Sequence, residues 1–390
     1  MKHLLTNRKF LFFSSILFLN YSCSIKAFQN ISSATLKTQK SSQKIHYQKS
    51  LNLVNIPIEI NGVQYRFIYD TGAQTTVISE ELSKKINLKS KGEIKVHDSQ
   101  NNSSKIRYGS IPQITIGENI YSDVGVAVSD FSKNKSFECF GVDGILGMNV
   151  IKLNNWKIDY SNNTLNSYSL NEKVEPSNLD SIIFQIKRGC PKTDLFVNGK
   201  STNFLIDIGK NDDKISLSTS HSGIEYHETY YGNQSSGLFG TSAPDTIKYA
   251  TVSMTDSSSF LEEHVTITQS KNFDQLIGNG FFAKRMKSIY FDFNNNVLYL
   301  ERKPSKEISK EYPFSFMITS DSQLLVSAVP ASNSVLQIGD LIKEVNGEVV
   351  NLSNFCMISL KIKELAEKGE DLHLKISRNN VEYLIDVAVY

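Results

Sequence analysis

An internal repeat constrains the fold of this 390-residue chain more than any other feature. The segment INGVQYRFIYDTG at 60–72 corresponds to VNGKSTNFLIDIG at 197–209. A second pair follows at similar spacing, because GILGMNV at 144–150 corresponds to QLIGNGF at 275–281. Two ordered blocks of this kind indicate a tandem duplication of one structural unit rather than coincidental Asn-Gly turns.

Each copy is predicted to be a β-rich lobe. Asn61-Gly62 and Asn198-Gly199 have the chemistry of two-residue hairpin turns, and they lie between runs rich in β-branched and aromatic residues. Short helices are expected at 148–153 and 279–285, directly after the apolar-apolar-Gly elements. The fold class is therefore mostly β. We place the two lobes at 49–170 and 171–305.

The N-terminus has the pattern of an export signal. Basic residues precede an apolar run of about ten residues, which is too short to span a bilayer comfortably. We expect a signal peptide at 1–22, a flexible tether at 23–48, and export to the periplasm or cell envelope. The sequence before Cys23 loosely resembles a bacterial lipoprotein cleavage site, which implies lipidation of Cys23, although Asn20 stands where the family prefers Leu. Cleavage near Ala27 and an anchor that stays uncleaved are the alternatives.

Composition excludes several classes of function. The 42 Lys and Arg residues nearly balance 40 Asp and Glu residues, so no basic surface for nucleic acid is indicated. The four cysteines are widely spaced, which excludes a disulfide-rich scaffold or a zinc ribbon. We expect Cys139 and Cys190 to be buried thiols rather than a bridge. The spacing of His221 and His227 fits no common zinc site, so we expect neither metal nor cofactor.

The tripeptide Asp70-Thr71-Gly72 follows an apolar run and is a candidate for acid/base chemistry. Gly72 permits a sharp turn that points backbone N–H groups at the carboxylate. Two lobes related by a pseudo-twofold axis would bring Asp70 and Asp207 face to face. Two carboxylates at close range cannot both ionise readily, so they share a proton. The ionised carboxylate can then deprotonate a water, while the protonated one donates a hydrogen bond to a peptide carbonyl.

These motifs resemble a known family. DTGA at 70–73 and ILG at 145–147 resemble the active-site loop and the following glycine element of retropepsin-like (clan AA) aspartic proteases. Over about residues 50–390 the chain resembles exported bacterial aspartyl proteases with two such repeats and a PDZ domain. The resemblance implies peptide-bond hydrolysis by a water between Asp70 and Asp207, without metal or organic cofactor. The implied active-site loops contain Thr71, Gly72, Ala73, Ile208 and Gly209.

The second copy departs from the family pattern. Ile208 stands where Thr or Ser would interlock the two active-site loops through a hydroxyl. At 210–213 the sequence KNDD, with a lysine and two acids, replaces the usual small residues. Three hypotheses follow. The leading one is a monomeric, single-chain endopeptidase acting on peptides or proteins. The others are a catalytically impaired peptide-binding protein and a homodimer that pairs Asp70 from two chains.

Two stretches lie where aspartic proteases carry a flap. One is 93–111, with a turn at 99–103, and the other is the Gly- and Ser-rich stretch 232–242. Each is either a flap over the substrate or an ordinary surface loop.

Residues 309–390 are predicted to form a separate α+β unit. An amphipathic helix is expected at 354–368, ended by Gly369 and followed by a closing hairpin. The motifs IGDLI at 338–342 and VNG at 345–347 resemble a PDZ domain, which implies capture of a C-terminal peptide by strand addition. The implied carboxylate loop contains Phe314, Ser315 and Phe316, without the family's usual glycine. The alternative is a packing module that only positions the lobes.

Overall fold

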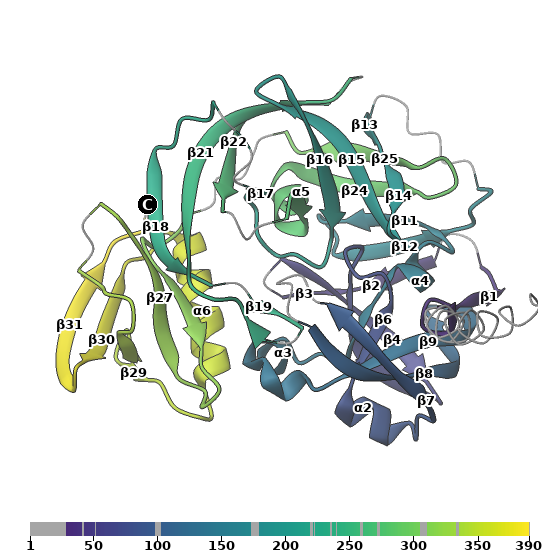
Figure 1. Ribbon diagram of the computed structural model, residues 1–390, viewed down its shortest axis with the longest axis horizontal. Coiled ribbons are helices and arrows are strands. Elements are labelled where there is room, and N and C mark those ends of the chain that lie inside the picture. Colours follow the sequence, from purple (N-terminus) through teal and green to yellow (C-terminus); the bar gives the residue numbers. More distant parts are fainter. Residues whose placement is uncertain are drawn as a thin grey trace, which may run out of the picture.

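The computed structural model describes most of the chain between residues 29 and 389 (Figure 1). The gaps in that span are 41–42, 51, 98–102, 173–178, 219–220, 222, 235, 239, 258–259, 271–273, 305–309 and 333–334. The expected signal peptide at 1–22 and the acylation site at Cys23 lie outside the described residues. Within them, no helix combines the length and apolar character needed to cross a membrane.

A nine-stranded sheet forms the first lobe, the nearer of the two repeats to the N-terminus. Short helices and a 3-10 turn flank it: α2 (Glu80–Lys85), η1 (Phe131–Lys133), α3 (Lys135–Phe140) and α4 (Met148–Ile151). The strands, in spatial order, are β1 (Thr35–Thr38), β9 (Asn119–Ser129), β6 (Thr76–Ser79), β10 (Gly144–Leu146), β5 (Val63–Tyr69), β4 (Leu53–Ile60), β8 (Ser103–Ile116) and β7 (Ser90–His97), with β3 (Gln48–Ser50) beside β4.

The second lobe has its own sheet, which continues into the C-terminal module, residues 310–389. The strands of the lobe, in spatial order, are β14 (Gln185–Lys187), β15 (Cys190–Val197), β16 (Lys200–Asp207), β23 (Leu276–Gly278), β17 (Ile215–Leu217), β22 (Leu261–Gln269), β21 (Asp245–Thr255) and β18 (Glu228–Asn233). A small separate hairpin, β19 (Ser236–Gly237) and β20 (Gly240–Thr241), extends from it.

The two lobes share one pattern of strand pairing. In the first, β10 runs parallel to β5 and antiparallel to β6, which is itself parallel to β9. In the second, β23 runs parallel to β16 and antiparallel to β17, which is parallel to β22. The sequence repeat therefore corresponds to equivalent strands. The expected short helices are present as α4 and α5 (Asn279–Arg285).

A six-stranded sheet joins the two halves of the chain. Its strands, in spatial order, are β13 (Asp180–Ile183), β25 (Val297–Arg302), β24 (Met286–Asp292), β11 (Asn155–Asp159), β12 (Thr164–Tyr168) and β2 (Gln43–His46). The central pair β11–β24 comes from the two copies of the repeat, with Trp156 opposite Phe291. We call it the bridging sheet. Because both residues are fully buried, the two lobes have a common core.

The prediction of a flexible tether at 23–48 is wrong for the described residues of that range. β1 pairs with β9, and β2 pairs with β12 at the edge of the bridging sheet. Ile45 and Tyr47 alternate with polar residues and are buried in the core. This short alternation was hidden by a composition rich in Ser, Lys and Gln, but it gives the segment one apolar face that a sheet edge can cover.

The C-terminal module has a separate apolar core and lies to the left in Figure 1. The expected helix and closing hairpin are present as α6 (Phe355–Lys368) and as the last two strands, and Gly369 ends α6 with φ of 78°. The strands of the module are β26 (Ser315–Ile318), β27 (Leu324–Pro330), β28 (Leu341–Val345), β29 (Glu348–Val349), β30 (Leu372–Arg378) and β31 (Val381–Val387).

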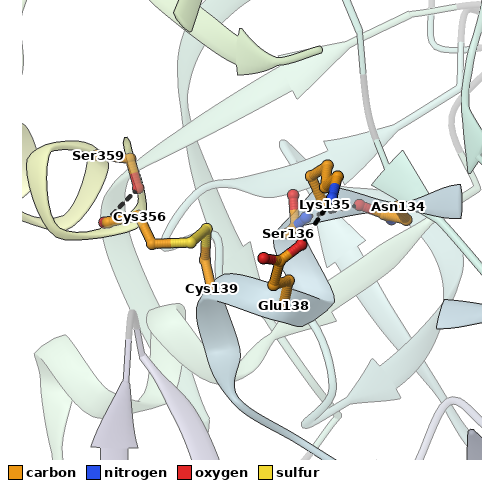
Figure 2. Close-up of a disulfide and its surroundings, with 7 residues drawn as sticks. All are labelled: Asn134, Lys135, Ser136, Glu138, Cys139, Cys356 and Ser359. Carbon is orange, nitrogen blue, oxygen red and sulfur yellow. Dashed lines mark hydrogen bonds and ion pairs between the residues drawn. A yellow bond between two sulfur atoms is a disulfide. The ribbon is translucent and has the colours of Figure 1, made fainter. Parts of the chain in front are cut away.

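A disulfide joins the module to the first lobe. Cys139 of α3 is bonded to Cys356 of α6 across a sequence separation of 217 residues, as Figure 2 shows. The expectation that Cys139 is a buried thiol is therefore wrong, whereas Cys190 is buried and free. Sequence spacing could not identify the pair, because the two helices meet only through the tertiary fold.

Candidate functional site

Asp70 lies at the end of β5, where the chain turns sharply. Its backbone N–H donates to the carbonyl of Leu146 at 3.0 Å, which ties the turn to β10. Its Oδ1 accepts hydrogen bonds from the backbone N–H of Gly72 at 2.7 Å and of Ala73 at 3.0 Å. The Asp-Thr-Gly turn thus directs two backbone donors at one carboxyl oxygen.

Asp207 occupies the equivalent place at the end of β16. Its Oδ1 accepts from the backbone N–H of Gly209 at 2.9 Å, and its carbonyl accepts from the N–H of Lys210 at 3.2 Å. The same turn is therefore formed although Ile208 replaces threonine.

The two loops bring their carboxyl groups together. A Cβ placed on Gly72 would lie 2.6 Å from Cγ of Asp207, and one placed on Gly209 would lie 2.2 Å from Cγ of Asp70. Each glycine therefore lies directly against the opposite carboxyl group and leaves no room for a side chain. Asp70 and Asp207 form a reciprocal pair across the junction of the lobes.

Burial raises the pKa of both acids. The adjacent Asp207 raises the pKa of Asp70 further, to well above its usual range. At Asp207 burial also raises the pKa, but the hydrogen bond from Asp70 and the positive charge of Lys210 offset part of that effect. The two acids therefore titrate as a coupled pair that shares one proton.

One hydroxyl locks the two loops together. The buried Thr71 Oγ1 donates to the carbonyl of Ile206 at 2.7 Å and accepts from the N–H of Ile208 at 3.0 Å. The side chain of Ile208 makes no such bond and is fully buried in the apolar core. The interlock between the loops is therefore one-sided.

Two asparagines that the sequence analysis missed support the loops. Asn149 Oδ1 accepts from both the backbone N–H and the hydroxyl of Thr76, each at 2.9 Å. In the second lobe, Asn279 donates from its backbone N–H to the carbonyl of Lys210 at 2.7 Å. The sequence signal that could have identified these asparagines was their position just after the apolar-apolar-Gly elements. Gly280 stands in the alignment position of Asn149, so the second loop lacks that side-chain clamp.

Cys190 is a further residue beside the pair that the sequence analysis did not place there. Its Sγ donates to the carbonyl of Gly72 at 3.3 Å. Burial, together with the nearby Asp70 and Asp207, raises the pKa of the thiol to about 12. The thiol therefore stays protonated and acts as a donor to the loop rather than as a nucleophile.

An apolar cluster lies beside the Asp70 loop. Ala73 packs against buried side chains from the sheet and from η1 of the first lobe, among them Val77, Tyr108 and Phe131. Leu238 of the second lobe packs against the same cluster, and the carbonyl of Gly237 accepts from Asn134 Nδ2 at 2.9 Å.

The two flap candidates differ in their contacts. β7 and β8 form the hairpin expected in the first stretch, but its turn at 98–102 lies outside the described residues. The second stretch reaches across to the first lobe through Gly237 and Leu238.

The residues expected to hold a C-terminal peptide lie at the start of β26. Phe314 is buried in the core of the module, so its side chain is not available to a ligand, whereas Ser315 and Phe316 are half-buried. The neighbouring strand β27 already pairs with β18 of the second lobe, Tyr231 lying opposite Val329. Among the described residues, no group of three or more His, Cys, Asp or Glu side chains could hold a metal ion.

One family model matches part of the chain. The model of the aspartyl protease family matches residues 56–150, which include Asp70 and the Ile145-Leu146-Gly147 element but not Asp207. No characterised protein matches the chain significantly. The match indicates a hydrolase with protease activity in general.

Proposed function

We propose that this chain is an aspartic endopeptidase that hydrolyses peptide bonds with a water activated between Asp70 and Asp207. The observation that carries the proposal is the reciprocal contact of Gly72 with the carboxyl of Asp207 and of Gly209 with that of Asp70. Two acids held so close, one protonated and one ionised, provide both partners of general acid/base catalysis.

In the reaction that we propose, each of the two acids has one role. The Asp207 carboxylate removes a proton from the water, whose oxygen bonds to the peptide carbon while Asp70 donates its proton to the carbonyl oxygen. As the resulting gem-diol collapses, the C–N bond breaks and the leaving nitrogen takes the proton from Asp207. One hydroxyl of the gem-diol returns a proton to Asp70, so the pair regains its starting state.

The wider architecture belongs to the same proposal. The shared strand pairing supports two retropepsin-like lobes, and the separate α+β core of the module supports a C-terminal PDZ domain. A bridge between Cys139 and Cys356 suits an oxidising compartment, which supports export to the periplasm or cell envelope. Membrane attachment through Cys23 and a peptide ligand for the module belong to the same proposal.

The decisive experiment is cleavage of a mixed peptide library by the mature chain and by its Asp70→Asn variant. We expect peptide products from the first and none above background from the second. An impaired peptide-binding protein, which Ile208 favours, would instead enrich peptides from the library without cutting them. Equal cleavage by both forms would refute the catalytic assignment.

A further inference from the structure

The second active-site loop is held by Asn279 of its own lobe and is also fastened from outside that lobe. It runs from Asp207 to Lys214 and carries charged side chains where the first loop carries neutral ones. The first loop is clamped by Asn149 of the same lobe, whereas Gly280 provides no side chain for the second. A Cβ on Gly280 would lie 2.5 Å from the carbonyl oxygen of Asn211, so that position admits only glycine.

Lys214 connects this loop to the C-terminal module. Its side chain is only 15% exposed and forms ion pairs with Asp213, at 3.5 Å, and with Glu311 of the module. Its ammonium group also lies 5.9 Å from the ring centre of Tyr249. An ammonium group this well shielded from water needs its acidic partners, so the position of Lys214 depends on Glu311.

A short series of contacts leads from Lys214 to Asp207. The backbone N–H of Lys214 donates to Asp212 Oδ1 at 3.0 Å, and Asp212 pairs with Lys210 at 3.8 Å. Lys210 directly follows Gly209, the donor to Asp207, and its N–H donates to the Asp207 carbonyl. A displacement of Lys214 would therefore move the backbone that supports Asp207.

We propose that Lys214 and Glu311 fasten the second active-site loop, so that the C-terminal module positions Asp207 for catalysis. Lys214 is a positioning residue, because it acts through the loop rather than on the substrate. The proposal rests on the proposed function for its kinetic consequence, but the fastening itself can be measured without cleavage.

The kinetic test compares Lys214→Met and Glu311→Gln with wild type in the full chain. We expect kcat to fall about ten- to a hundred-fold with little change in KM, because a small misplacement of a catalytic group is costly. The double variant should lose no more than either single variant, since both remove one interaction. Lys214→Arg should retain most of kcat, and the charge exchange Lys214→Glu with Glu311→Lys should restore part of it.

Glu367→Gln is the matched control. Glu367 pairs with Lys284 at 3.7 Å, so this ion pair also joins the module to the second lobe, but it ends on α5 rather than on the loop. We expect kcat of Glu367→Gln to equal that of wild type. A general loosening of the module would lower kcat in all of these variants alike.

Amide hydrogen exchange gives a readout that needs no cleavage. Peptides covering 207–214 should exchange at least several-fold faster in Lys214→Met and Glu311→Gln than in wild type or Glu367→Gln. If wild type shows no Asp70-dependent cleavage, the proposed function fails, and exchange alone decides whether the contact fastens the loop. If wild type cleaves but Lys214→Met matches Glu367→Gln in kcat and exchange, this inference alone is overturned.

Discussion

The two active-site loops have the same turn around their aspartates but different supports. The first loop is held within its lobe by Asn149 and is tied to the second lobe by Thr71, in both cases through hydrogen bonds between neutral groups. The second is held by the charged side chains of 210–214 and by Glu311 of the C-terminal module. The comparison teaches that neutral groups of the two lobes hold one half of the pair, whereas the other half also depends on charged groups and on the C-terminal module.

The largest expected effect concerns the aspartates themselves. Asp70→Asn and Asp207→Asn should each lower kcat by at least about 10²–10⁴, because loss of either group removes one partner of the acid/base pair. Initial rates on a cleaved peptide measure this. If Asp207→Asn stays active while Asp70→Asn is dead, the second lobe is only a scaffold. Specific activity that falls on dilution would then indicate a homodimer pairing two copies of Asp70.

The disulfide should have the next largest effect, on stability. Cys139→Ser should lower the free energy of unfolding by about 2–5 kcal/mol, because the bridge closes a long loop between the first lobe and the module. Urea denaturation monitored by circular dichroism measures the change. Cys356→Ser should have the same effect, and adding a reductant to either variant should have none. An unchanged midpoint in both variants would show that the bridge does not stabilise the fold.

The one-sided interlock can be tested at Thr71. Thr71→Val leaves the buried Ile206 carbonyl and Ile208 N–H without partners and should cost about 1–3 kcal/mol for each unsatisfied group. Ile208→Val only shortens a buried side chain and should cost about 0.5–1.5 kcal/mol. Thermal unfolding of both variants measures which substitution costs more stability. Equal losses would mean that the hydroxyl contributes no more than apolar packing.

The buried acids should also destabilise the folded protein at neutral pH. Because folding raises the pKa of Asp70, binding of a proton to this carboxyl favours the folded state. This stabilisation is complete below the ordinary pKa of a carboxyl, and it is lost as pH rises through the raised pKa. Asp70→Asn should therefore be more stable than wild type at pH 7, by about 1.4 kcal/mol per unit of raised pKa. The two proteins should converge near pH 3. A variant less stable than wild type at pH 7 would contradict this.

The smallest effect is expected from Ile208→Thr. The new hydroxyl would offer the second loop the interlock that Thr71 provides for the first, worth about 0.5–1.5 kcal/mol, but it would sacrifice buried apolar surface. The net change in stability should stay within about 1 kcal/mol, and kcat should rise. A loss of both stability and kcat would show that the loop is repacked around isoleucine.

Much of this organisation could be predicted from sequence. The two repeats, the Asp-Thr-Gly turn and α6 were accessible because each depends on local turn chemistry or on a regular apolar spacing. The disulfide and the contact between Lys214 and Glu311 were not, because they join residues that only the tertiary fold brings together. The charges at 210–213 were noticed as a departure, but their partners in the module could not be inferred from the loop alone.

The bridging sheet has a consequence for how the chain reaches its native state. Its central pair joins β11 to β24, and its outer strand β2 comes from near the N-terminus. A first lobe made alone would present β11 as an unpaired edge with Trp156 uncovered, which invites aggregation. Pairings between such distant segments also imply high contact order and slow folding. During synthesis the bridging sheet must therefore remain incomplete, and the chain prone to aggregation, until β24 has emerged from the ribosome.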